Sequence, residues 1–311
     1  MADCCATKSR LNQIILKKRF TNKYSGKFAK TNNVLDLTTM IINPQNHLAL
    51  TSICQSAGQG RWRTETMRSH TSPRLIFVTR GQGRITVSGL TSGYGANNLM
   101  YIPARTMYGF EVSNTVFGVI LTVPTAMATE WPSNSVHLRL RDVIAQKELA
   151  GQMESLEREL KSTQPGHYRA AHYQVGLLSI YLERQMAMRP ETLTDNRANT
   201  AAAKLVAAYT SLIDRDYHQH AGVADYAANL GVTPTHLARC CKKTCGKSAL
   251  SLLNDRILFE ARILLRNSKI PVHKIATDLG FSSAAYFARA FQAHTSLTPS
   301  QFRQKGPLAQ A

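Results

Sequence analysis

The chain has 311 residues, of which 43% are hydrophobic and 18% charged, and its formal net charge is +19. This length allows two domains with separate hydrophobic cores, and no run approaches the roughly eighteen apolar residues that a membrane-spanning helix needs. The excess of cations indicates an anionic partner such as DNA, although RNA or an anionic membrane surface would attract the same charge.

The cysteines and the N-terminus point to a reducing compartment. Six cysteines without regular spacing do not suggest a disulfide framework. The only apolar run near the N-terminus, Ile14 to Leu16, is too short for a secretory signal. A bacterial cytoplasm fits both features, so we expect a cytoplasmic protein.

Residues 1–33 are basic, polar and almost free of acidic side chains. This composition predicts a flexible arm, and an arm that adds contacts to phosphates remains an alternative. Cys4 and Cys5 have no third ligand nearby, so we predict no metal there.

From residue 34 to residue 124, short β segments alternate with glycine-rich turns. The run RLIFVTRGQGRITVSG predicts a hairpin with strands at 75–79 and 84–88 around a turn at Gly81 to Gly83. Further strands are expected at 99–104 and 116–123. Closely spaced strands favour a small sandwich or barrel, and we predict a cupin-like jelly roll.

Residues 125–189 form a segment with two helical patterns, over 136–162 and 166–189, each with an apolar stripe. The first stripe comprises Val136, Leu140, Val143, Leu149, Met153, Leu156 and Leu160, and the second comprises Val175, Leu178, Leu182 and Met186. Residues 190–199, PETLTDNRAN, are polar and helix-breaking, which predicts a linker.

The remaining chain carries one helix-turn-helix pattern twice, over residues 223–246 and 272–296. The matching residues are Val223, Ala227, Leu230 and Gly231 with Val272, Ala276, Leu279 and Gly280 and, after one inserted residue, Leu237 and Arg239 with Phe287 and Arg289. Recurrence of the small residue, the turn residue and the apolar contacts favours two genuine units over a chance repeat in a helical bundle.

Each unit has the residues that a tight turn between helices requires. Gly231 and Gly280 tolerate positive φ, and Thr233 and Ser282 stand where an N-cap begins the second helix. Pro234 follows at the first helical position, where its missing N–H is not needed.

Between the units, Ser248 to Lys269 predicts a helix with an apolar stripe formed by Leu252, Leu253, Ile257, Ala261, Leu264 and Leu265. Twenty helical residues span roughly 30 Å, close to the roughly 34 Å of one turn of B-DNA. A helix of this length could hold both recognition helices on one face of a duplex.

Residues 200–305 resemble the DNA-binding domain of the AraC/XylS family of bacterial regulators, through HKIATDLGFSSAAYFARAFQ and through LTPSQFR, which ends at Arg303. The resemblance implies a DNA-binding transcription regulator, with activation as its expected mode of action. It places base-contacting positions at Thr235, Ala238 and Arg239 in the first unit and at Ala284, Ala285 and Arg289 in the second. The protein is then a two-domain chain, with an all-β effector domain and an all-α double helix-turn-helix domain.

This chain departs from the long polar side chains that many relatives carry at those positions. Alanine can touch a thymine methyl group but cannot hydrogen-bond a base edge, so discrimination is expected to rest on Arg239, His236, Arg289 and DNA shape. Cys241 stands where relatives usually have a phenylalanine like Phe291, which predicts looser packing in the first unit.

The turn at Arg80 to Gly83 and the segment IPARTMYGF resemble the effector domain of AraC-type regulators. That resemblance points to a small-molecule site at His70, Tyr108, Phe110 and Arg80, although each side chain could equally pack within the barrel. Aromatic and cationic groups would suit an aromatic or carboxylated metabolite. A metal-binding cupin has a histidine where Tyr108 stands, so we predict no metal, no cofactor and no enzymatic activity.

By the same resemblance, RNA polymerase is an expected partner, and the 125–189 helices either form a homodimer contact or pack on the barrel. The competing hypothesis is a cupin enzyme or sugar-binding protein with an incidental helical tail. Cys240, Cys241 and Cys245 suggest either small core residues or a redox or metal switch. A DNA-alkylation repair protein is not favoured, because its zinc-binding cysteines are missing.

Overall fold

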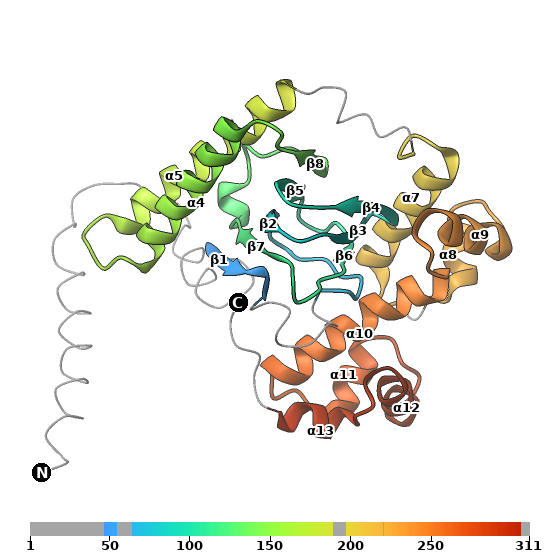
Figure 1. Cartoon of the computed structure of the whole chain (residues 1–311). Helices are drawn as coiled ribbons and strands as arrows, with labels where there is room; N and C mark the ends of the chain where they lie inside the picture. The colour runs from blue at the N-terminus through green and yellow to red at the C-terminus, as the bar shows by residue number, and fades with distance from the viewer. Residues whose placement is uncertain (1–46, 55–63, 189–196, 220, 306–311) are drawn as a thin grey trace, which may run out of the picture. The chain divides into compact units, whose positions relative to one another are not determined.

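The computed structural model describes residues 47–54, 64–188, 197–219 and 221–305. Within these ranges an all-β region with two long helices is followed by an all-α region (Figure 1), which confirms the predicted fold class. The arm at 1–33, Cys4, Cys5 and most of the 190–199 linker lie outside the described residues.

The strands of the described chain form two antiparallel sheets, with the orders β1-β7-β2-β5-β8 and β4-β3-β6. Their bounds are β1 (Ala49–Ser52), β2 (Arg74–Arg80), β3 (Gly83–Val87), β4 (Leu90–Tyr94), β5 (Asn98–Ile102), β6 (Tyr108–Phe110), β7 (Phe117–Thr122) and β8 (Val136–Arg139), and a short 3-10 helix follows β7 at Thr125–Met127. Two facing sheets agree with the double-sheet arrangement of a jelly roll.

The larger sheet is buried on both faces. Along β2, Leu75 and Phe77 join the hydrophobic cluster on the helix side of the sheet, whereas Ile76 and Val78 join the cluster between the sheets. Alternate residues of a strand point to opposite faces, so a strand covered on both sides needs a continuous apolar run. All five residues of β5 are buried for this reason.

The predicted hairpin between β2 and β3 is wrong, although both strands exist. Both edges of β2 are occupied by β5 and β7, and β3 pairs with β4 and β6 in the other sheet. The chain crosses between the sheets at Gly81, which has φ +90°, and a Cβ there would lie 2.5 Å from the Thr115 carbonyl oxygen. A glycine-rich turn can join two sheets as well as two paired strands, and only the long-range partners decide.

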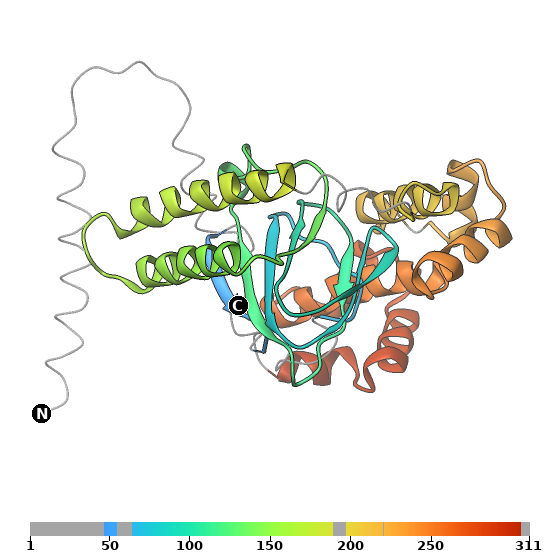
Figure 2. The same cartoon turned by 45° about the horizontal axis from the view of Figure 1, so that its top comes forward.

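Helices α4 (Val143–Lys161) and α5 (His167–Ala187) pack as an antiparallel pair (Figure 2) against the larger sheet. Leu149, Met153, Leu178 and Leu182 from the predicted stripes are buried in that contact. The stripes therefore pack on the β region, which was one of the two alternatives.

The helix predicted to begin at residue 136 begins only at Val143, and this part of the prediction is wrong. Residues 136–139 form β8, which pairs with β5 and buries Val136 and Leu138 by strand alternation. Asp142 then caps α4 by accepting hydrogen bonds from the backbone N–H groups of Ile144 and Ala145. Val143, counted in the predicted stripe, is exposed. The β region thus extends beyond residue 124.

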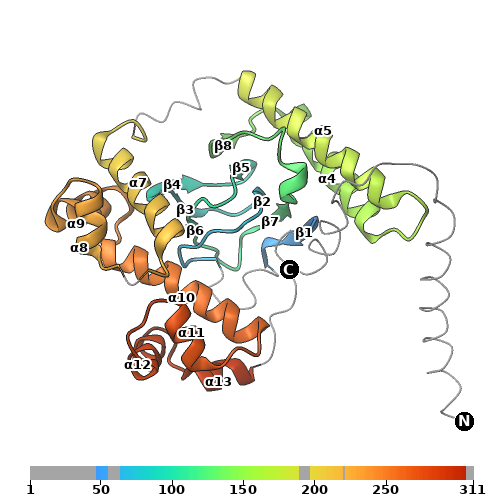
Figure 3. The same ribbon diagram turned by 180° about the vertical axis from the view of Figure 1, so that it is seen from behind.

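The C-terminal region consists of helices packed around α10, which are seen from behind in Figure 3. Their bounds are α7 (Ala201–Asp216), α8 (Val223–Asn229), α9 (Pro234–Cys245), α10 (Ala249–Asn267), α11 (Val272–Asp278), α12 (Ala284–Thr295) and α13 (Pro299–Gln304). No helix in the described ranges has both the length and the apolarity that crossing a lipid bilayer requires.

Candidate DNA-binding interface and ligand cavity

The first helix-turn-helix unit, α8–α9, has the local geometry that its sequence predicts. Gly231 has φ +67° in the turn, and the Thr233 hydroxyl accepts a hydrogen bond from the His236 backbone N–H at 3.2 Å. Pro234 is the first residue of α9. Leu237 and Ala227 are fully buried where the two helices meet.

The second unit, α11–α12, has the same plan with a turn that is one residue longer. Gly280 has φ +86°, and Ala276 and Phe287 are buried between the helices. The N-cap is Ser283, whose hydroxyl accepts from the Tyr286 N–H at 3.1 Å, and not Ser282 as predicted. The inserted residue therefore lies in the turn, because the cap must directly precede the first turn of α12.

Helix α10 joins the cores of the two units. Ala249, Leu252 and Leu253 of its first half belong to the cluster that contains Leu237 of α9. The apolar residues of its second half, Leu258, Ala261 and Leu265, belong to the cluster that contains Phe287 of α12. Because one rigid helix contributes to both cores, the spacing of α9 and α12 is set by the roughly 28 Å length of its 19 residues.

The side chains predicted to contact DNA lie on the outer faces of α9 and α12. Thr235, His236, Arg239, Ala284, Ala285 and Arg289 are exposed, and Ala238 is half-buried. A nitrogen of the Arg239 guanidinium lies 3.1 Å from Nδ1 of His236, which holds the two side chains together. Among the described residues, neither Arg239 nor Arg289 forms an ion pair, so both charges are available to a ligand.

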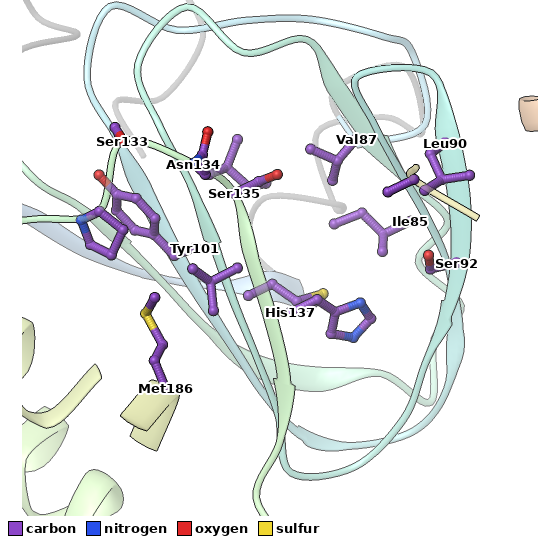
Figure 4. A pocket seen from close by; sticks show the side chains of 15 residues that line it. Ile85, Val87, Leu90, Ser92, Tyr101, Ser133, Asn134, Ser135, His137 and Met186 are labelled. Carbon is purple, nitrogen blue, oxygen red and sulfur yellow. The ribbon is translucent and has the colours of Figure 1, made fainter. Parts of the chain in front are cut away.

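A cavity of about 470 Å³ opens in the β region (Figure 4). Its walls are largely apolar, with Ile85, Val87, Leu90, Met100, Ile102 and Val136. The lining residues with polar side chains are Tyr101, Ser92, Ser133, Asn134, Ser135 and His137, and none of the lining residues that the structure describes is an acid, a lysine or an arginine. His137 Nε2 lies 2.7 Å from the side-chain oxygen of Asn98, which fixes the imidazole.

None of the four predicted ligand residues lines this cavity. Tyr108 and Phe110 are buried between the sheets with ring centroids 6.5 Å apart, and His70 lies 5.9 Å from the Tyr108 ring. His70 also borders a second, more polar hollow with Arg105. Arg80 is exposed at the end of β2, over the Phe117 ring. The roles of these residues in ligand binding remain predictions, and the cavity residues were not signalled by any motif.

The three cysteines of α9 have the surroundings of core residues. Cys241 is fully buried, and this burial raises the pKa of its thiol to about 12. Burial also raises the pKa of Cys245. The described residues contain no group of three or more histidine, cysteine or acidic side chains that could hold a metal ion. The geometry favours the packing interpretation over the switch.

Comparison with known proteins adds evidence that is independent of this geometry. Residues 226–305 match the family model of a helix-turn-helix domain. The arabinose operon regulatory protein of Salmonella typhimurium is 30% identical over 132 residues, which cover 42% of this chain and 44% of that protein. The C-terminal region is an AraC-type helix-turn-helix domain.

Other similar proteins share less of their length or sequence. An uncharacterized HTH-type transcriptional regulator of Staphylococcus aureus is 24% identical over 74% of this chain and 31% of its own length. The chain therefore matches less than half the length of these curated relatives. Among solved structures, the C-terminal domain of the response regulator AraT from Geobacillus stearothermophilus aligns with 35% of this chain and 89% of its own at 24% identity and a TM-score of 0.32. ToxT from Vibrio cholerae aligns with 83% and 94% at 12% identity and a TM-score of 0.40.

One exposed aromatic residue of the AraC-type domain was missed by the sequence analysis. Tyr286 of α12 is 55% exposed and lies beside the predicted positions Ala285 and Arg289. Its ring packs against Phe281 at 5.9 Å between centroids, which orients it. The capped helices α9 and α12 start fifty residues apart, so Tyr286 is the counterpart of His236, and the repeat itself could have revealed it.

Arg303, at the end of the LTPSQFR segment, makes a structural contact with α10 and the residues that follow it. Its guanidinium donates to the backbone carbonyl of Leu265 at 3.4 Å and to that of Ile270 at 2.5 Å. These carbonyls lie at the end of α10 and just after it, where helical hydrogen bonding stops. Arg303 thus links α13 by hydrogen bonds to the C-terminal end of α10, the helix that joins the two units.

Proposed function

We propose that this protein is a transcription regulator that binds promoter DNA by inserting α9 and α12 into successive major grooves. The observation that carries the proposal is the position of α10, whose two halves each complete the core of one unit. Its length of roughly 28 Å approaches the roughly 34 Å repeat of B-DNA, and a major groove is wide enough to admit a helix.

In this proposal Arg239 and Arg289 are the main base-reading side chains, because arginine can bond the O6 and N7 acceptors of guanine together. His236 and Tyr286 flank them at equivalent places, and both are exposed. Ala284 and Ala285 would lie against thymine methyl groups, so specificity in the second unit would depend more on DNA shape.

A gel-shift titration of the full chain on the DNA upstream of its own and neighbouring genes tests the proposal. We expect one fragment to be bound selectively, with log affinity falling by about 0.9 per neutralised phosphate against log salt. The double variant Arg239→Ala/Arg289→Ala should lose the selectivity. Arg215→Ala is the matched control, since Arg215 is an exposed arginine of α7 that pairs with Asp216. Equal affinity of the wild type for random DNA would contradict the proposal.

The protein is also proposed to act as a homodimer through α5. Tyr173, Leu177 and Ile180 are 64%, 50% and 41% exposed and share one face at helical spacing, away from the stripe that packs on the sheet. Continuous exposed apolar surface on a helix is typical of an interaction site.

Analytical ultracentrifugation tests the dimer. Leu177→Glu should shift the protein to a monomer, because a carboxylate in an apolar contact is not compensated. Leu250→Glu, at an equally exposed leucine of α10, is the control and should leave the mass unchanged. A wild-type monomer at micromolar concentration would remove the dimer from the proposal.

We further propose that a small molecule bound in the β region changes how the two DNA-reading domains of the dimer are presented, and that the bound regulator contacts RNA polymerase as an activator in the cytoplasm. A promoter–reporter fusion measures this directly. Expression should rise when the regulator is supplied with its effector and should fall when the regulator is deleted. A rise on deletion would reverse the sign of regulation and indicate a repressor.

A further inference from the structure

Two arginines lie between the β sheets close to one aromatic side chain. The Arg68 side chain is only 4% exposed, and its guanidinium carbon lies 4.4 Å from the centroid of the Tyr108 ring and 5.5 Å from that of Phe110. Arg74 donates a hydrogen bond to the Thr122 hydroxyl, and its buried Nε has no hydrogen-bond partner.

Neither guanidinium has a carboxylate partner among the described residues. Arg68 donates to the backbone carbonyls of Thr64 and Thr66, at 2.7 and 3.3 Å, and Arg74 donates to a hydroxyl group. Burial lowers the pKa of both arginines, and the nearby charge of Arg74 lowers the pKa of Arg68 further. A buried and a half-buried guanidinium without a counter-charge are costly, so the site favours an anion.

The same protein shows how a buried arginine is ordinarily compensated. Arg256 of α10 is also buried, and its guanidinium pairs with Asp214 at 3.0 Å and with Glu260 at 2.9 Å. Arg68 is buried to a similar extent and Arg74 is half-buried, but neither has an acidic partner among the described residues. Within the described chain Arg68 and Arg74 therefore lack a counter-charge, and an anionic ligand would supply one.

The arginine pair adjoins the inner end of the apolar cavity. Arg74 pairs across the sheet with Ile102, and Tyr108 pairs with Val87. Ile102 and Val87 both line the cavity. Side chains of directly paired residues point to the same face with Cβ atoms about 5 Å apart. The two arginines thus neighbour residues of the cavity wall, and the described part of that wall has no acid, lysine or arginine of its own.

We infer that the effector is an apolar anion, whose hydrophobic body fills the cavity beside Ile102 and Val87 and whose carboxylate or similar acid is neutralised by Arg74 and Arg68. This inference rests on the proposed response to an effector and names the chemical class of that effector. Hydrogen bonds to an ionised group are among the strong ones, and the apolar walls account for the remaining affinity.

A matched pair of fluorescent probes tests the inference without DNA, so its outcome is separate from that of the gel shift. The probes are 1-anilinonaphthalene-8-sulfonate and N-phenyl-1-naphthylamine, which share the aromatic rings and differ by the sulfonate. We expect the wild type to bind the sulfonate more tightly. Arg74→Met should weaken sulfonate binding about tenfold, equivalent to about 1.4 kcal/mol, and should leave the neutral probe unchanged. Arg68→Met removes the second charge independently.

Three further variants locate the effect. Arg74→Lys keeps a positive charge and should keep most of the sulfonate binding. Leu90→Trp narrows the cavity and should weaken both probes. Arg84→Met, at an exposed arginine that pairs with Glu111, should change neither. A thermal melt of each variant confirms folding before titration. Equal binding of both probes by the wild type, or an equal loss of both in Arg74→Met and Arg68→Met, would overturn the inference.

Discussion

The two helix-turn-helix units share one backbone plan but fill their cores with different side chains. In the core of the second unit, Phe287 and Phe291 of α12 and Phe302 of the neighbouring α13 pack in series, with ring centroids 5.7 and 5.3 Å apart. In the first unit, Leu237 and Cys241 occupy the positions of the first two phenylalanines. The same motif can therefore be stabilised by large residues of its own or by neighbours.

The neighbour of the first unit is α7. Tyr209 of that helix is fully buried, belongs to the same cluster as Cys241, and donates a hydrogen bond to the Ala249 carbonyl at 2.9 Å. Met67 and Met107 of the β region join the same cluster. The second unit is covered by α13 instead. We infer that the first unit depends on distant parts of the chain, whereas the second is nearly self-contained.

Removing one phenylalanine ring from the core of the second unit should have a greater effect than any other change proposed here. Phe291→Ala should lower the free energy of unfolding of its unit by about 3–5 kcal/mol, because it leaves a cavity among packed rings. Urea denaturation followed by circular dichroism measures it. Tyr286→Ala, at an exposed ring on the same helix, is the control and should cost well under 1 kcal/mol. A similar loss in both variants would contradict the core assignment.

The next prediction separates the two units on DNA. Arg239→Ala and Arg289→Ala should each weaken binding by about 1–3 kcal/mol and relax specificity in one half of the site only. Nuclease footprinting on the selected fragment resolves the halves. If either variant leaves the footprint unchanged, that arginine does not read bases; if either erases both halves, the units do not bind independently.

The cores should also differ in their response to alkaline pH. Because burial raises the pKa of Cys241 from 9.0 to about 12, the unfolded chain loses this proton first. The contribution of the protonated Cys241 thiol to the free energy of unfolding is fully present below pH 9. It is lost as the pH rises towards 12, at up to about 1.4 kcal/mol per pH unit. Urea midpoints from pH 8 to 10.5 measure it, with Cys241→Ala as the comparison. Parallel curves for wild type and variant would exclude Cys241 as the cause.

The smallest prediction concerns the turns. Thr233→Ala and Ser283→Ala each remove an N-cap and should cost about 1 kcal/mol of unfolding free energy. Ser282→Ala, one residue earlier, removes no cap and should be nearly neutral. The reverse order for the two serines would restore the sequence prediction and place the inserted residue elsewhere.

Short-range rules explain which parts of the site the sequence could predict. Positive φ at Gly231 and Gly280, the cap at Thr233, and the exposure of Arg239 and Arg289 depend on residues within one or two turns. The prediction from sequence placed the cap at Ser282 instead of Ser283 and did not single out the exposed Tyr286, because the repeat located the inserted residue only approximately.

The two-region architecture, the repeated units and the helix that joins them could be predicted from the amino-acid sequence, because hydrophobic periodicity and turn residues act locally. The folded structure was needed to show that β2 and β3 lie in different sheets, that residues 136–139 form a strand and that Tyr209 lies beside Cys241. It also brought Arg68 and Arg74 together without an acid. The reason is physical: strand pairing and burial depend on partners far apart in the chain, and no local pattern records them.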